Sequence, residues 1–163
     1  MGALGNLLGM LSISIPSPFI RIELHLSQLP PLLIGVTLGP SWGAIAGALS
    51  LIMATLHIGN PLIPLGNAIL AGIAGLAARR FRPLVACLIG ELAETPFIWF
   101  SILAWAGIIC GVPLRALIPI IGIVNLKAFL EVLISASIIE MLLRHPAVPN
   151  FICSLKGGPS PGE

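Results

Sequence analysis

Apolar stretches, separated by short segments rich in glycine, proline or charge, make up the sequence from residue 2 to about residue 143. Runs of roughly 20 apolar residues are typical of helices that cross a membrane. The pattern predicts an all-α polytopic membrane bundle of six transmembrane helices. These helices are expected at residues 2–15, 28–38, 40–57, 65–78, 84–110 and 116–143.

Only a Gly-Pro pair separates the second of these helices from the third. The stretch "LPPLLIGVTLGPSWGAIAG" therefore forms either one kinked helix or two short ones. Pro40 has no N–H and its ring clashes inside a helix, at about 3 kcal/mol or more, and Gly39 before it is disfavoured in the α region. Two helices are favoured for these reasons. Glycines recur at every fourth position, a spacing typical of close helix packing: Gly35, Gly39, Gly43 and Gly47.

The choice between one helix and two has a consequence for function. A helix over 28–38 is only about 17 Å long at about 1.5 Å per residue, against a hydrocarbon core of about 30 Å. A half-length helix is tolerated at membrane depth only where its ends are buried in protein or line a cavity. Two short helices therefore predict a polar pocket, whereas one kinked helix does not.

The segment 16–28 is the longest moderately polar interval before the C-terminal tail. Its residues alternate between apolar and polar, as in Leu24, His25 and Leu26. A period of two predicts an extended segment that lies over something apolar.

Three arginines give the strongest signal of orientation. Arg79, Arg80 and Arg82 share one loop, and basic residues favour the cytoplasmic side of a membrane. Counting from that loop predicts that both termini and the 39–40 break are cytoplasmic. The 16–28 segment then lies outside the cell. A five-segment count fits the charges similarly well.

Composition supports a membrane protein built as one unit. Of the 163 residues, 57% are hydrophobic and 9% are charged, the mean hydropathy is +1.08, and soluble proteins carry about 25% charged residues. We expect a single transmembrane domain over 1–150 and a flexible tail rich in Gly, Pro and Ser over 151–163. The net charge of +2 gives no indication of nucleic-acid binding. The sequence contains no recognised enzyme motif and no phosphate-binding loop.

Ionisable side chains inside the apolar runs are the first candidates for a functional site, because they are costly in a membrane. Glu91 and Glu94 are three residues apart, and Lys127 and Glu131 are four apart, so each pair shares one helix face. One interpretation is a structural ion pair that neutralises the bundle interior. The other is a site for a polar solute, and the two are compatible.

The run "IELHLSQLPPLLIGVTLGPSWGAIAGAL" (22–49) resembles the substrate-binding S component of energy-coupling factor (ECF) vitamin transporters. The positions that fit the family pattern are Leu26, Ser27, Leu29, Pro30, Gly35, Gly39, Pro40, Gly43 and Gly47. "GNAILAGIAGLAARRF" (66–81) is similar to the family's fourth helix, and "NLKAFLEVLI" (125–134) to its sixth. The resemblance extends to about residue 145.

This resemblance implies a binding subunit in the bilayer of the cytoplasmic membrane, with a pocket on the extracellular side. It implies that small residues of the first helix, Gly5 and Gly9, contact a transmembrane coupling subunit. Two partner ATPase subunits would use ATP, and this chain would bind no cofactor. The family's metal-binding start "M-H-I-P" is missing from this sequence, so no metal site is expected.

The favoured hypothesis is a non-enzymatic subunit that binds a vitamin or related micronutrient for import. We expect the substrate-binding residues to be His25, Gln28, Asn60, Asn67, Glu94, Asn125, Lys127 and Glu131. For each asparagine taken alone, a cap or turn role is the more usual one. The tryptophans Trp42, Trp99 and Trp105 are expected as interfacial or lipid-facing anchors. The alternative is a membrane scaffold that binds partner helices through its glycines and has no small-molecule site.

Overall fold

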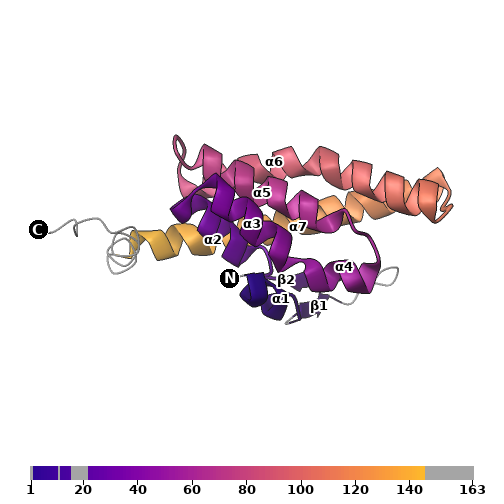
Figure 1. Ribbon diagram of the computed structural model, residues 1–163, viewed down its shortest axis with the longest axis horizontal. Coiled ribbons are helices and arrows are strands. Elements are labelled where there is room, and N and C mark those ends of the chain that lie inside the picture. Colours follow the sequence, from indigo (N-terminus) through magenta and orange to yellow (C-terminus); the bar gives the residue numbers. More distant parts are fainter. Residues whose placement is uncertain (1, 11, 16–21, 146–163) are drawn as a thin grey trace, which may run out of the picture.

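The protein is a helical bundle, seen in a computed structural model that describes residues 2–10, 12–15 and 22–145 (Figure 1). Its elements are α1 (Gly2–Met10), β1 (Ser12–Ile15), β2 (Ile22–His25), α2 (Leu29–Leu38), α3 (Pro40–Ser50), α4 (Ile52–Ile58), α5 (Ile63–Ala77), α6 (Pro83–Ile102), η1 (Leu103–Ile109) and α7 (Leu114–Arg144). Since α4 continues α3 and η1 continues α6, the described residues form six helical segments, and the predicted all-α class is confirmed.

Three of these segments are long and apolar enough to cross a membrane: Pro40–Ile58, Pro83–Ile109 and Leu114–Arg144. The helices α2 and α5 are apolar but shorter. At nine residues, α1 is about 14 Å long, which is under half the thickness of a hydrocarbon core.

The chain breaks at Gly39, so the prediction of two helices is confirmed. Gly39 has φ +107°, a backbone conformation that favours glycine. Pro40 occupies the first turn of α3, where its missing N–H has no partner to lose. The Gly39 N–H donates to Gly35 O at 3.1 Å and closes α2, while Gly39 O accepts from Gly43 N at 3.0 Å and opens α3.

The glycines with four-residue spacing pack α2 and α3 against each other and against α5. A Cβ atom at Gly43 would lie 2.6 Å from both Gly35 Cα and Ala71 O. A Cβ at Gly47 would collide with the backbone of Asn67. The small residues therefore let three helix backbones approach closely. This close packing is between helices of the same chain.

The Gly39 break and the arginine-bearing loop between α5 and α6 lie at the same end of the bundle. Pro40 packs against Gly75 near the end of α5, where a Cβ on Gly75 would lie 3.0 Å from Pro40 Cα. At that end Leu84 N donates to Glu140 Oε2 at 3.3 Å, which joins the start of α6 to the end of α7. Figure 1 shows the α5–α6 connection and the last turns of α7 at one end. This agrees with the predicted placement of break and arginines on one side.

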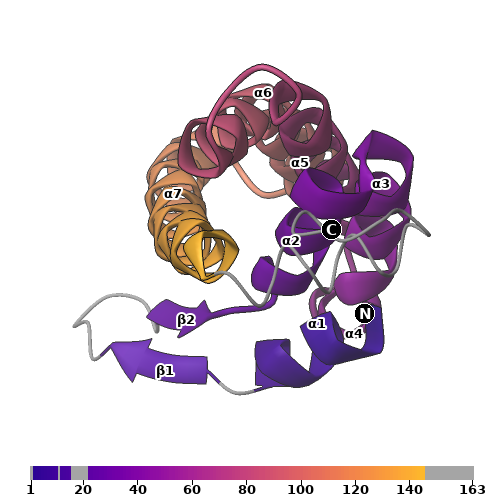
Figure 2. The same cartoon turned by 90° about the vertical axis from the view of Figure 1, so that its left-hand side faces the viewer.

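The prediction of a helix over 2–15 is wrong in its second half. Helix α1 ends at Met10, and Ser12–Ile15 forms a strand that pairs antiparallel with β2, with Ser12 opposite His25. The alternation of Ser and Ile over 12–15 has the period of a strand, and β-branched isoleucine favours that conformation. In Figure 2 the two strands lie beside α1 and α7.

The extended conformation predicted within 16–28 is confirmed for β2. Residues 16–21 of that segment lie outside the described residues, as does the tail predicted over 151–163. The main apolar core joins four helices, α2, α5, α6 and α7. Its members are Leu32, Leu70, Ala74, Cys87, Val132, Ala136 and Ile139.

Candidate functional site

A cavity of about 350 Å³ opens among α4, α5, α6, η1 and α7, and the connection from β2 to α2 closes one side of it. It reaches Trp105 in η1 and Ile120 near the start of α7, so it lies in the half of the bundle away from the arginine-bearing loop. Its walls are mostly apolar, with a few polar side chains. These are His25, Gln28, Asn60, Glu94, Ser101, Lys127 and Glu131.

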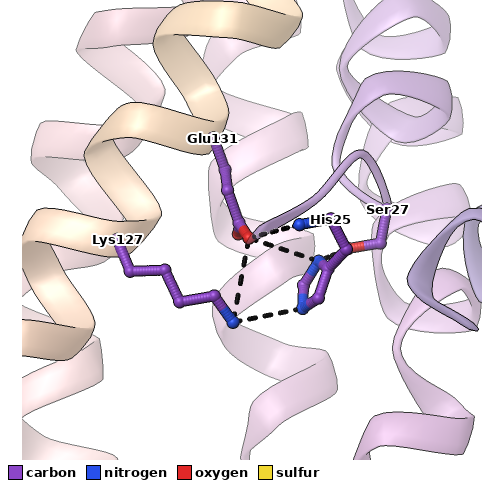
Figure 3. A network of polar contacts seen from close by, with 4 residues as sticks. All are labelled: His25, Ser27, Lys127 and Glu131. Carbon is purple, nitrogen blue, oxygen red and sulfur yellow. Dashed lines mark hydrogen bonds and ion pairs between the residues drawn. The ribbon is translucent and has the colours of Figure 1, made fainter. Parts of the chain in front are cut away.

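One wall of the cavity holds a network centred on Glu131 (Figure 3). Glu131 Oε1 accepts a hydrogen bond from the His25 backbone N at 2.9 Å and lies 3.7 Å from Lys127 Nζ. Lys127 Nζ is 3.2 Å from His25 Nε2, and Ser27 Oγ is 2.8 Å from His25 Nδ1. The network ties the β2–α2 connection to α7, 106 residues away in sequence.

Lys127 and Glu131 thus form an ion pair inside the bundle, which is one of the two interpretations of their spacing in the sequence. The side chain of Glu131 is 4% exposed, and a carboxylate buried this deeply is tolerated only when it is paired and hydrogen-bonded. Both residues also line the cavity. The ion pair and the candidate site therefore coincide.

Glu94 and Gln28 line the same cavity but have unused acceptors. Each residue is 6% exposed, and neither Glu94 Oε2 nor Gln28 Oε1 has a hydrogen-bond partner among the described residues. The carboxylate of Glu94 fits there because Gly66 faces it, since a Cβ on Gly66 would lie 2.8 Å from Glu94 Oε1. Buried oxygens without partners are rare in proteins. These two atoms are themselves closed off from the cavity, so the candidate for contact with a bound molecule is the other carboxylate oxygen of Glu94, Oε1, which faces the cavity-lining Gly66.

The three predicted asparagines separate into two groups. Asn60 lines the cavity and also accepts a hydrogen bond from Leu62 N at 3.0 Å, which shapes the turn before α5. Asn67 is fully buried and donates to Gly47 O at 3.0 Å and Ser50 Oγ at 2.7 Å, so it joins α5 to α3. Asn125 donates to Ile121 O, 2.8 Å away in its own helix. Neither Asn67 nor Asn125 is among the residues that line the cavity.

The structure thus brings six of the eight predicted binding residues to one cavity: His25, Gln28, Asn60, Glu94, Lys127 and Glu131. Their role in binding stays a prediction. Glu91, one turn before Glu94, is 1% exposed and is not among the described residues that line the cavity.

Sequence reasoning missed the aromatic wall of the cavity. Trp105 and Phe97 both line it, although Trp105 was expected as an anchor. Trp105 belongs to η1, a π-helix, where Cys110 N donates to Trp105 O at 3.0 Å across five residues. Such wide turns often occur at functional sites. Trp42 and Trp99, by contrast, are 61% and 48% exposed, as anchors would be.

The glycines of α1 pack against the chain itself. A Cβ on Gly5 would collide with Ser50 Cβ and lie 3.1 Å from Ser27 O. One on Gly9 would lie 3.6 Å from Ser27 Cβ. The predicted contact of these glycines with a coupling subunit stays a prediction.

Comparison with known proteins identifies the fold. No protein-family model and no curated protein matches the sequence. A solved structure of the S component of a bacterial ECF transporter superposes with a TM-score of 0.60, covers 90% of each chain and is 19% identical in sequence. The chain therefore has the fold of an ECF S component. At this identity the similarity establishes the fold alone.

Proposed function

We propose that this chain is the substrate-binding membrane subunit of an ECF-type importer. In this proposal it captures a vitamin or related micronutrient in its cavity, within the cytoplasmic membrane. A transmembrane coupling subunit and two ATPase subunits would supply the energy, and the chain itself performs no catalysis.

The cavity of about 350 Å³ is the observation that carries this proposal. Its volume falls in the range of small-molecule sites, which are mostly apolar and contain a few placed polar groups. Polar groups from the β2–α2 connection, α6 and α7 face one apolar chamber. The fold shared with a transporter S component supports the same function.

The scaffold alternative loses part of its support. It needs glycines that are available to partner helices, but Gly35, Gly43 and Gly47 are occupied by backbone contacts within the chain. A small-molecule site therefore explains more of the structure than a docking surface does.

Thermal-shift screening of the purified protein against water-soluble vitamins and their precursors tests the proposal. We expect at least one compound to raise the melting temperature. Ala54→Phe places a phenyl ring where Ala54 lines the cavity and should abolish that shift. Leu56→Phe, on the same helix but 73% exposed, is the matched control and should keep it. If no compound stabilises the wild-type protein, the proposal fails.

A further inference from the structure

The carboxylate of Glu94 is buried without a charged or hydrogen-bonding partner among the described residues. The residue is 6% exposed, and its carboxylate has no hydrogen bond or ion pair within the part of the chain that the structure describes. An isolated ionised carboxylate in an apolar environment is strongly unfavourable unless a partner reaches it. The partner is therefore either a proton or a group of the bound molecule.

The surrounding charges leave an acidic excess. Among the described residues that line the cavity, Lys127 is the only lysine or arginine. It pairs with Glu131 at 3.7 Å, and His25 Nδ1 lies 3.5 Å from the same carboxylate, so both basic side chains are directed at Glu131 and neither at Glu94. Glu91 lies three residues before Glu94 in α6, on the same helix face, and it has no ion pair among the described residues either. A cation in the cavity next to Glu94 would relieve this excess, whereas an anion would increase it.

The hydrogen-bonding groups favour the same kind of molecule. Ser101 lines the cavity and already donates its hydroxyl proton to Ile98 O at 3.2 Å, which leaves its oxygen as an acceptor in addition to the carboxylate of Glu94. The cavity thus offers acceptors to a donor-rich molecule. Phe97 and Trp105 on its wall add flat aromatic surface, which attracts planar rings and cations.

We infer that the cavity selects a planar molecule whose positively charged, amidinium-like group donates N–H hydrogen bonds to Glu94. Ser101 Oγ accepts a further hydrogen bond from the same molecule. Because Glu94 Oε2 is closed off from the cavity, the amidinium donates to Oε1, and a hydrogen bond between two charged groups is about twice as strong as one between neutral groups. This inference rests on the proposed function, since it names the class of substrate for the same cavity.

Three probes of equal size test the inference: 2-naphthamidine, 2-naphthamide and 2-naphthoate. They share one ring system and carry a cationic, a neutral and an anionic group. Isothermal titration of the protein in lipid nanodiscs gives each Kd. Because hydrogen bonds to charged groups contribute about 1.5–3 kcal/mol, we expect the amidine to bind about 10- to 100-fold more tightly than the amide. The carboxylate should bind most weakly.

Glu94→Gln keeps the shape of the side chain and removes its charge, so the preference for the amidine should fall to within a few-fold of unity. Glu140→Gln is the matched control, because Glu140 pairs with Arg144 and does not line the cavity. It should leave the preference unchanged. The order of the three probes on the wild-type protein tests the inference even if Glu94→Gln does not fold.

Equal or tighter binding of the amide or the carboxylate overturns the inference, and so does a preference that survives Glu94→Gln. The absence of binding by all three probes also overturns it. If vitamin-sized compounds of other charge still stabilise the protein, only the substrate class is wrong. If no compound of any charge binds, the proposed function fails as well.

Discussion

Replacing Gly43 by alanine tests the packing of α2 and α3 across the Gly39 break. The added methyl group would lie 2.6 Å from Gly35 Cα and from Ala71 O. Both neighbours are backbone atoms, which cannot rotate away as a side chain would. The helices must therefore move apart.

The size of the effect follows from two opposing contributions. Overpacking a tight site costs typically about 1–3 kcal/mol, whereas alanine is favoured over glycine in a helix by up to about 1 kcal/mol. Gly122→Ala isolates the second contribution, because a Cβ at Gly122 meets nothing within 4 Å. The difference between the two variants is therefore about 1–3 kcal/mol in the free energy of unfolding.

Thermal unfolding in detergent, followed by tryptophan fluorescence, measures this difference. For a chain of this size about 1 kcal/mol corresponds to about 2–4 °C, so Gly43→Ala should melt roughly 2–12 °C below Gly122→Ala. Equal melting temperatures would show that α2, α3 and α5 do not approach as closely as the structure has them. The close packing across the break would then be wrong.

Three other substitutions separate structural residues from binding residues. Asn67→Leu removes the hydrogen bonds from Asn67 to α3 and should lower stability by about 1–3 kcal/mol, measured by thermal unfolding, while ligand affinity stays unchanged. Gly66→Ala places a methyl group 2.8 Å from Glu94 Oε1, so it should weaken ligand binding by about tenfold in a titration, or about 1.4 kcal/mol. Trp105→Phe should remove most of the fluorescence change on ligand binding, because Trp105 lines the cavity, whereas Trp99→Phe should retain it.

Each of these predictions has an outcome that contradicts it. A loss of affinity in Asn67→Leu at temperatures where the variant is folded would place that amide in the site. Unchanged affinity in Gly66→Ala would remove Glu94 from it. If Trp99→Phe removed the fluorescence change and Trp105→Phe kept it, the ligand would lie elsewhere.

Much of the fold could be predicted from the sequence, because apolar run lengths and Gly-Pro chemistry are local properties. The break at Gly39 follows from the proline after it, and α2 begins within one residue of its predicted start. The strand Ser12–Ile15 was missed because it continues an apolar run. Only its pairing with β2, a contact distant in sequence, decides its conformation.

The candidate site could be predicted only in part, since spacing along a helix does not fix where a side chain points. Asn67 and Glu94 were both predicted as binding residues, yet Asn67 faces α3 and Glu94 lines the cavity. Trp105 was placed wrongly for a related reason. A π-helix changes the number of residues per turn and therefore the direction in which each side chain points. No residue in the run "LAWAGII" indicates a π-helix.

Native mass spectrometry of the protein released from lipid tests the central claim most directly. If the cavity is a substrate site, the wild-type protein should carry a small molecule in addition to its own mass. Ala54→Phe, which places a phenyl ring in the cavity, should not carry it, and Leu56→Phe should. A wild-type protein that shows only its bare mass, even after incubation with the vitamin panel, would contradict the claim.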